Sequence, residues 1–231
     1  ACPFVDRARL VMQVLNSDAQ KSGRKVMYAF NITDEIDAMR RNIDLLESLG
    51  ATCAMISLNS IGIAGLRAVR DHSPLPIHAH RNGWGLMSRS PHIGIDYSAM
   101  QKMWRLAGSD HLHVNGLANK FTENDVVVTN AARAVQAPLS EAKPHAALPV
   151  FSSGQTAWQV GPSMELLGND DFLFCAGGGI MSHPDGPAAG ITSLRQAAAA
   201  QKAGERVEDY AKDHPELAAA LTTFKSTVNR N

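Results

Sequence analysis

The chain has 231 residues, of which 45% are hydrophobic and 19% are charged, a balance typical of a globular protein with one substantial core. Lys plus Arg and Asp plus Glu both number 22, so no excess positive charge favours nucleic acid or an anionic membrane, and we expect neither as a partner. Three widely spaced cysteines, no apolar run of about 18 residues and no signal-peptide pattern predict a soluble, cytoplasmic protein.

Short apolar strands alternate with helical patterns along the chain. Six strands are predicted, at residues 25–30, 52–58, 75–80, 111–114, 147–151 and 172–175. Helices are predicted before, between and after them, at residues 1–22, 33–49, around 66–69, 97–106, 124–136, 162–168 and 187–204, with two more to the C-terminus. Thr33 and Asp96 are expected to cap helices, and Pro162 is expected to begin one.

This alternation predicts parallel β/α units, because parallel neighbours need a crossover connection. Every predicted strand ends in polar residues or glycines. In barrels and open parallel sheets, ligands bind at the carboxyl ends of the strands, so we expect these residues to converge on one mouth. They are Asn31, Asn59, His80, Arg81, His113, Asn115, Ser152 and the glycines at 177–179.

The expected architecture is an incomplete (β/α)8 TIM barrel. A closed barrel needs eight units and about 250 residues, whereas this chain has six and begins on a helix. The alternative, a six-stranded open sheet, would expose two long edges. We therefore expect the first two strands to precede Ala1. Residues 1–205 would form the partial barrel and residues 206–231 a C-terminal helical extension.

Two histidine pairs occur at strand spacing. His78 and His80 lie two apart in LPIHAHRNGWG and project from one side of a strand, directly before Arg81. His111 and His113 repeat this spacing. Four imidazoles suit zinc, but neither HExxH nor CxxC is present. The alternative to a functional site is that this stretch is only the end of a strand, whose histidines are hydrogen-bonded core residues. We expect one histidine of each pair to be structural and the other to bind or transfer protons.

The glycines at 177–179 follow a strand, where successive backbone N–H groups can bind a phosphate. The alternative is a tight turn that needs glycine for positive φ. Ser152 and Ser153 end the preceding strand and can donate to the same ligand. Neither lies in a Gly-x-Ser-x-Gly elbow, which excludes a serine nucleophile of that type. Lys120 lies in a polar loop, where the alternative to a role in the site is an ordinary solvated surface lysine.

Five ordered motifs carry a family resemblance over nearly the whole chain. They are HAHRNGW, SDHLHVNGLANK, PVFSSG, AGGGIMSHPDGPAAG and PELAAAL. Together they resemble the catalytic barrel of RuBisCO. KVMYAFNIT and VFSSGQ are most similar to the HRNGWG group of the RuBisCO-like proteins, the non-carboxylating branch.

The resemblance implies a Mg²⁺ ion held by a carbamylated lysine and two acidic residues. The strand that carries them is absent from this chain and is expected before Ala1, together with an α+β N-terminal domain that completes the site of a neighbouring subunit. A homodimer or higher homo-oligomer is therefore expected. No metal ligand is assigned within this chain.

The resemblance also implies roles for eight residues of this chain. His80 would be the catalytic proton carrier, and Lys120 corresponds to the lysine that polarises the gas molecule in carboxylases. Arg81, His113 and Ser152 would hold one substrate phosphate, and Gly177 and Gly178 the other anionic end. The residues expected to bind substrate are Arg81, His113, Ser152, Gly154, Gly177 and Gly178.

Four departures from the carboxylase pattern argue against carboxylation of ribulose bisphosphate. They are Trp84 in place of histidine, Asn119 in place of the glycine before Lys120, Phe121 after that lysine, and Ser153 in place of a phosphate-loop glycine.

The resemblance implies decarboxylation of a phosphorylated 3-oxo sugar acid, such as 3-oxo-isoapionate 4-phosphate, through a metal-stabilised enediolate. One alternative is an enolase or isomerase acting on a phosphorylated ketose, such as a methylthio-diketone phosphate. Another is a non-catalytic sugar-phosphate binding protein.

Overall fold

A computed structural model of the chain describes residues 2–90, 92–121 and 123–227. Two compact units divide these residues. The first comprises residues 1–112 and 138–147, and the second comprises residues 113–137 and 148–231. The predicted division near residue 205 stays a prediction.

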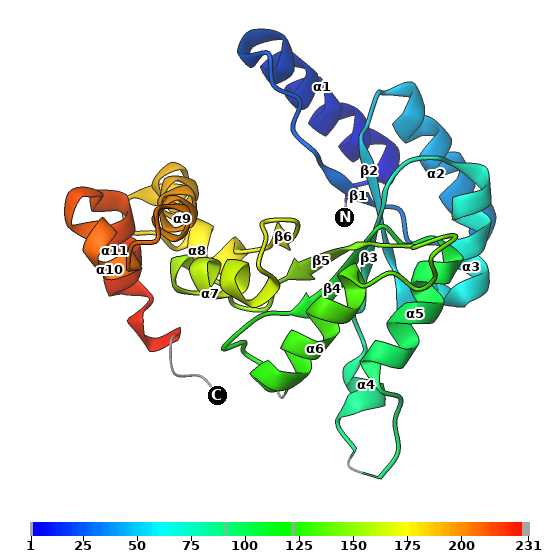
Figure 1. Cartoon of the computed structure of the whole chain (residues 1–231). Coiled ribbons are helices and arrows are strands. Elements are labelled where there is room, and N and C mark those ends of the chain that lie inside the picture. The colour runs from blue at the N-terminus through cyan, green and yellow to red at the C-terminus, as the bar shows by residue number, and fades with distance from the viewer. Residues whose placement is uncertain (1, 91, 122, 228–231) are drawn as a thin grey trace. The chain divides into compact units, whose positions relative to one another are not determined.

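All strand pairs with a described register are parallel, and the strands follow one another in sequence order, β1-β2-β3-β4-β5-β6 (Figure 1). The strands are β1 (Ala29–Asn31), β2 (Cys53–Ser57), β3 (Ile77–His80), β4 (His111–Asn115), β5 (Leu148–Phe151) and β6 (Leu173–Phe174). The predicted α/β class with parallel β/α units is confirmed.

One helix precedes the first strand, and further helices connect successive strands and follow the last one. They are α1 (Phe4–Ser22), α2 (Ile36–Ser48), α3 (Leu58–His72), α4 (Gly85–Ser88), α5 (Tyr97–Ala107), α6 (Asp125–Gln136), α7 (Ala157–Leu167), α8 (Gly177–Met181), α9 (Gly186–Ala203), α10 (Val207–Tyr210) and α11 (Pro215–Thr223), with 3-10 turns η1 (Ala211–Asp213) and η2 (Lys225–Thr227). Among the described residues, no helix is both long and apolar enough to cross a lipid bilayer.

In the first unit, β2 lies between two parallel neighbours. Its residues pair with β1 on one side and β3 on the other, with Met55 opposite both Asn31 and His78. The apolar face of α2 is fully buried through Met39 and Ile43, as the helical spacing predicts. These contacts hold the carboxyl ends of the strands in register.

Thr33 does not cap α2, contrary to the sequence prediction. The cap is Glu35, whose carboxylate accepts hydrogen bonds from the backbone N–H groups of Asp37 and Ala38. The Thr33 hydroxyl instead donates to the Asn31 side chain and accepts from the backbone N–H of Ser57. It therefore links the ends of β1 and β2. Asp96, by contrast, caps α5 as predicted.

In the second unit, α7, α9 and α11 enclose an apolar cluster that includes Leu217 and Ala197, which are almost completely buried. The Trp158 indole N–H donates to the carbonyl of Leu221 at 3.0 Å, which links α7 to α11. Pro162 lies inside α7 rather than at its start. A capping box between Thr156 and Gln159 begins the helix earlier and overrides the proline signal.

Candidate active site

The first unit presents His80 at the end of β3. The backbone N–H of Asn82 lies 3.0 Å from Nδ1 of His80, and the side-chain oxygen of Asn82 lies 3.3 Å from the same ring nitrogen. Burial lowers the pKa of His80; the hydrogen bond to the Asn82 side chain raises it and the charge of Arg81 lowers it. A lowered pKa favours the neutral form of the ring at pH 7, and both contacts of Asn82 fix its position at the strand end.

Arg81 follows His80 and rests on an aromatic platform. Its guanidinium carbon lies 4.2 Å from the ring centroid of Tyr97, a cation–π contact. The Trp84 ring packs edge-on against Tyr97 with centroids 5.1 Å apart. All three residues are more than nine-tenths buried. Trp84, where the resemblance has histidine, thus fixes the plane on which the cation lies.

Asn59, at the start of α3, holds the segment after His80. Its amide Nδ2 donates to the carbonyls of Asn82 at 2.8 Å and Arg81 at 3.3 Å. Gly83 completes this turn with φ of 81°, a conformation that favours glycine. Asn59, just after β2, therefore fixes the backbone beside His80 and Arg81.

His78 and His111 lie deeper on the paired strands β3 and β4. Their rings meet edge to face with centroids 5.6 Å apart. Burial lowers the pKa of His78 to about 4, with the nearby His111 and His80 adding to the effect. Burial also lowers the pKa of His111, while Asp110 raises it. Two neutral, buried rings fit the structural role predicted for one histidine of each pair.

The second unit joins the ends of β4 and β5 by hydrogen bonds. His113 Nδ1 lies 3.1 Å from Ser152 Oγ, and the Ser152 backbone N–H donates to the Asn115 carbonyl at 3.0 Å. Both site residues are more than nine-tenths buried. The structure thus brings together two of the residues predicted to hold one phosphate. Arg81, the third, belongs to the first unit.

Lys120 is exposed, but its backbone is fixed. Its N–H donates to the Ser153 carbonyl at 3.1 Å, and its Nζ lies 5.5 Å from the Phe121 ring centroid. The preceding Asn119 is only 1% exposed. The Asn119 Nδ2 donates to the carbonyls of Gly116 and Glu123, and its Oδ1 accepts from the Phe121 N–H. Lys120 therefore carries an exposed ammonium on a backbone that Asn119 and Ser153 hold in place.

The glycines after β6 form the first turn of α8, and none of Gly177, Gly178 and Gly179 has positive φ. The alternative of a positive-φ turn is therefore wrong. A Cβ atom on Gly179 would lie 2.9 Å from the carbonyl oxygen of Gln155, whereas Gly177 and Gly178 face open space. Gly154, after β5, does need glycine, since its φ is 92°.

Three residues of the second unit act together in a way that sequence reasoning missed. Asn115 and Ser153 adopt left-handed backbone conformations, with φ of 64° and 73°. Such conformations cost on the order of 1 kcal/mol or more and cluster at functional sites. Ser153 Oγ donates to Asn115 Oδ1 at 2.9 Å, and Asn115 Nδ2 donates to Glu123 Oε2 at 2.5 Å. Glu123 carries no motif, so no sequence signal singles it out.

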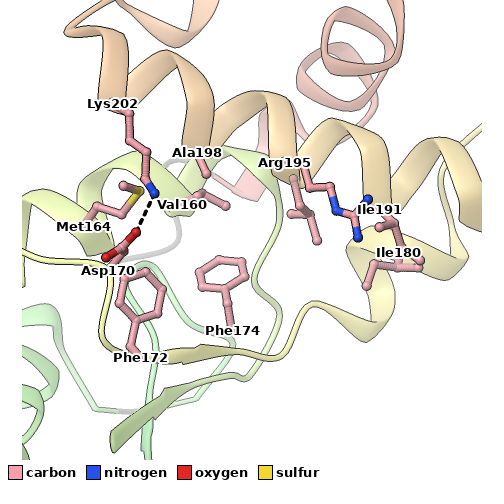
Figure 2. A pocket seen from close by; sticks show the side chains of 11 residues that line it. Val160, Met164, Asp170, Phe172, Phe174, Ile180, Ile191, Arg195, Ala198 and Lys202 are labelled. Carbon is pink, nitrogen blue, oxygen red and sulfur yellow. Dashed lines mark ion pairs between the residues drawn. The ribbon is translucent and has the colours of Figure 1, made fainter. Parts of the chain in front are cut away.

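The second unit also contains an apolar groove of about 300 Å³ beside β6. Phe172 and Phe174 form one wall, and Ala198 of α9 lies opposite, with the Lys202–Asp170 ion pair at one end (Figure 2). None of the predicted site residues lines this groove. It is therefore not the candidate active site.

Metal-ligating side chains do not cluster in the part of the chain that the structure describes. Among residues 2–90, 92–121 and 123–227, no three His, Cys, Asp or Glu residues are arranged to hold a metal ion. The Mg²⁺ implied by the resemblance therefore has no fitting ligand set on these residues.

Comparison with known proteins identifies the fold. Residues 2–224 match the model of the ribulose bisphosphate carboxylase large chain, catalytic domain. The chain belongs to this family. A crystal structure of a RuBisCO-like protein from Burkholderia fungorum matches with a TM-score of 0.93 and 48% identity, over 96% of this chain and 55% of that one. The predicted RuBisCO-type catalytic fold is confirmed.

Two relatives from the RuBisCO family carry informative names. A "3-oxo-isoapionate-4-phosphate transcarboxylase/hydrolase" of Xanthobacter autotrophicus is 52% identical over 220 residues, 95% of this chain and 53% of the relative. A "3-oxo-isoapionate-4-phosphate decarboxylase" of Rhizobium etli is 43% identical over 224 residues, 96% of this chain and 54% of the relative. The chain thus spans about half the length of the curated relatives it matches.

Proposed function

We propose that this chain supplies substrate-binding and proton-transfer groups to an enzyme that removes the carboxyl group of a phosphorylated 3-oxo sugar acid of the 3-oxo-isoapionate 4-phosphate type. The observation that carries the proposal is the pair of family relatives, 52% and 43% identical, both named for this substrate. The polar groups at the ends of β3, β4 and β5 support it, because they suit a charged sugar.

In this reaction, the bond between the carboxylate carbon and its neighbour breaks and CO₂ leaves. The electron pair moves onto the 3-oxo oxygen and gives an enediolate, which is then protonated on carbon. His80 would donate its Nε2 proton in a hydrogen bond to the developing oxyanion, a task suited to a neutral imidazole with a lowered pKa. The position of the ring, which Asn82 fixes through Nδ1 at the strand end, supports this role for His80.

Anion binding would fall to the remaining predicted residues. Arg81 would pair with a phosphate or carboxylate oxygen. In the second unit, His113 and Ser152 would donate to a phosphate, with Gly154 allowing close approach of the backbone. Gly177 and Gly178 would offer backbone N–H groups at a surface free of side chains. Lys120 would place its ammonium near the negative charge that develops in the reaction.

Magnesium dependence is part of the proposal, with ligands, including a carbamylated lysine, outside the described residues. The ion would supply Lewis-acid stabilisation of negative charge. We also propose a homodimer or larger homo-oligomer in the cytoplasm. Solved relatives include an archaeal RuBisCO from Hyperthermus butylicus described as dimeric and one from Pyrococcus horikoshii described as octameric.

A second candidate is a transcarboxylase/hydrolase, since the relative from Xanthobacter autotrophicus carries that name. The two reactions differ in the fate of the carboxyl carbon, which leaves as CO₂ in the first and is transferred in the second. An isomerase would retain every carbon of its substrate, and a binding protein would turn over nothing. Analysis of the products therefore distinguishes a decarboxylase, a transcarboxylase/hydrolase, an isomerase and a binding protein.

The site assignment is tested by two substitutions in the full-length protein. His80→Asn is expected to lower kcat by about 100-fold or more, with little change in thermal stability. Arg81→Ala is expected chiefly to raise KM, by about tenfold or more. His92→Asn, at an exposed histidine, is the matched control. Equal loss of stability in the His80 and Arg81 variants, with the kcat and KM effects absent, would contradict the assignment.

A further inference from the structure

A chain of side-chain hydrogen bonds runs through the second unit from a carboxylate to an imidazole. Glu123 Oε2 accepts from Asn115 Nδ2 at 2.5 Å, and Asn115 Oδ1 accepts from Ser153 Oγ at 2.9 Å. Ser153 Oγ lies 3.3 Å from Ser152 Oγ, which lies 3.1 Å from His113 Nδ1. Five side chains that span the ends of β4 and β5 are thereby connected.

Glu123 sets the direction of this chain. An ionised carboxylate only accepts hydrogen bonds, so it orients the Asn115 amide with nitrogen toward Glu123 and oxygen toward Ser153. The Ser153 hydroxyl must then donate to Asn115. Its lone pairs remain available to accept from Ser152 or a ligand. The carboxylate thus determines the orientation of a hydroxyl two residues along the chain of bonds.

The backbone supports a role for these side chains beyond packing. Ser153 has φ of 73° and Asn115 has φ of 64°, in the left-handed region that favours glycine. Glycine would satisfy the backbone at position 153 without strain, so the hydroxyl is what the serine adds. The hydrogen bond to Asn115 is where that hydroxyl acts.

Glu123 is also tied to the segment that carries Lys120. Its backbone carbonyl accepts from Asn119 Nδ2 at 2.8 Å, a bond that does not depend on the side chain at position 123. The carboxylate is connected to the Lys120 segment through Asn115 and Ser153, since the Ser153 carbonyl accepts from the Lys120 N–H at 3.1 Å. The Glu123 side chain therefore acts on the Lys120 segment through Asn115 and Ser153.

We propose that Glu123 is a positioning residue, which orients the Ser152–Ser153 hydroxyls for a phosphate group of the substrate and holds the segment that carries Lys120. This inference rests on the proposed function for the identity of the ligand as a sugar phosphate. It assigns to Glu123 no contact with the reacting atoms.

The test compares four variants of the full-length protein. Glu123→Ala removes the acceptor, Glu123→Gln keeps an oxygen that can accept from Asn115, and Ser153→Gly removes the hydroxyl while relieving the backbone. Glu141→Ala, at an exposed glutamate of the first unit, is the control. Each is titrated with inorganic phosphate, and amide hydrogen exchange is followed at residues 113–121.

Glu123→Ala is expected to weaken phosphate binding by about tenfold and to speed exchange around Lys120, whereas Glu123→Gln restores both to near the unsubstituted values. Ser153→Gly is expected to weaken phosphate binding without loss of thermal stability. Unchanged binding and exchange in Glu123→Ala would overturn the inference, as would absence of phosphate binding by the unsubstituted protein.

Neither readout needs the sugar acid. If the enzyme released no CO₂ from it, the proposed function would fail while these results still decided the role of Glu123. With an active enzyme, a rise in KM with nearly constant kcat in Glu123→Ala would support positioning for binding. A fall in stability alone, not rescued by Glu123→Gln, would mean that Glu123 is only structural and would overturn the inference.

Discussion

Acid is expected to destabilise the first unit through His78, and the size of the effect follows from its burial. The side chain is 7% exposed, and burial beside His111 lowers its pKa from 6.5 to about 4. The folded state therefore binds the proton less tightly than the unfolded state. The contribution of His78 to the free energy of unfolding is fully present above pH 6.5. It is lost as the pH drops from 6.5 toward 4, because the unfolded state binds more protons than the folded state in this range.

The two pKa values give the magnitude. Between pH 7.5 and pH 5, His78 alone is expected to remove about 2 kcal/mol from the free energy of unfolding. The pKa of His111 is lowered in the same direction by its own burial, so the pair adds to this loss. Such an effect is a large share of the stability of an ordinary domain.

The assay is urea denaturation of the full-length protein and of His78→Gln at both pH values, followed by far-UV circular dichroism. Other titrating groups cancel in the comparison, and His92→Gln, at an exposed histidine, serves as the control. The variant is expected to lose about 2 kcal/mol less than the unsubstituted protein on acidification. Equal losses in the two proteins would refute the reasoning.

Three further outcomes are expected. Gly179→Ala should destabilise the fold by about 1–3 kcal/mol in thermal unfolding, because its Cβ would meet the Gln155 carbonyl oxygen at 2.9 Å. Gly178→Ala, in open space, should leave the fold intact and weaken phosphate binding. A destabilised Gly178→Ala beside an unaffected Gly179→Ala would contradict both assignments. Arg105→Met should cost about 2–3 kcal/mol in urea, since this fully buried arginine donates to the carbonyl of His145 at 2.8 Å; a loss below 0.5 kcal/mol, roughly the surface value, would count against it. Chelation with EDTA should abolish turnover and added Mg²⁺ should restore it, whereas turnover that persists in EDTA would argue against magnesium dependence.

Local patterns predicted the elements well, because each depends on residues near one another in sequence. The apolar face of α2 and the Asp96 cap of α5 are examples. One pattern misled because a contact distant in sequence decided the outcome. Thr33 resembles a helix cap, but its hydroxyl is engaged by the backbone of Ser57, 24 residues away. The short helix α4 had no apolar periodicity to reveal it.

The site was predictable in its residue types but not in its connections. Spacing placed His78 and His80 on one side of a strand. Only the structure distinguishes the buried His78, whose pKa is lowered to about 4, from His80, whose ring Asn82 holds at the strand end. The bond between His113 and Ser152 joins residues 39 apart in sequence. Glu123 lies in no motif, so its role depends wholly on three-dimensional contacts.

The most direct test of the account is the fate of the carboxyl carbon. Full-length protein with Mg²⁺ is given 3-oxo-isoapionate 4-phosphate labelled with ¹³C in its carboxyl group, and the label is followed by NMR. We expect one labelled CO₂ per substrate consumed, and almost none with His80→Asn. Label retained in a phosphorylated or hydrolysed product, or turnover undiminished in His80→Asn, would contradict the account.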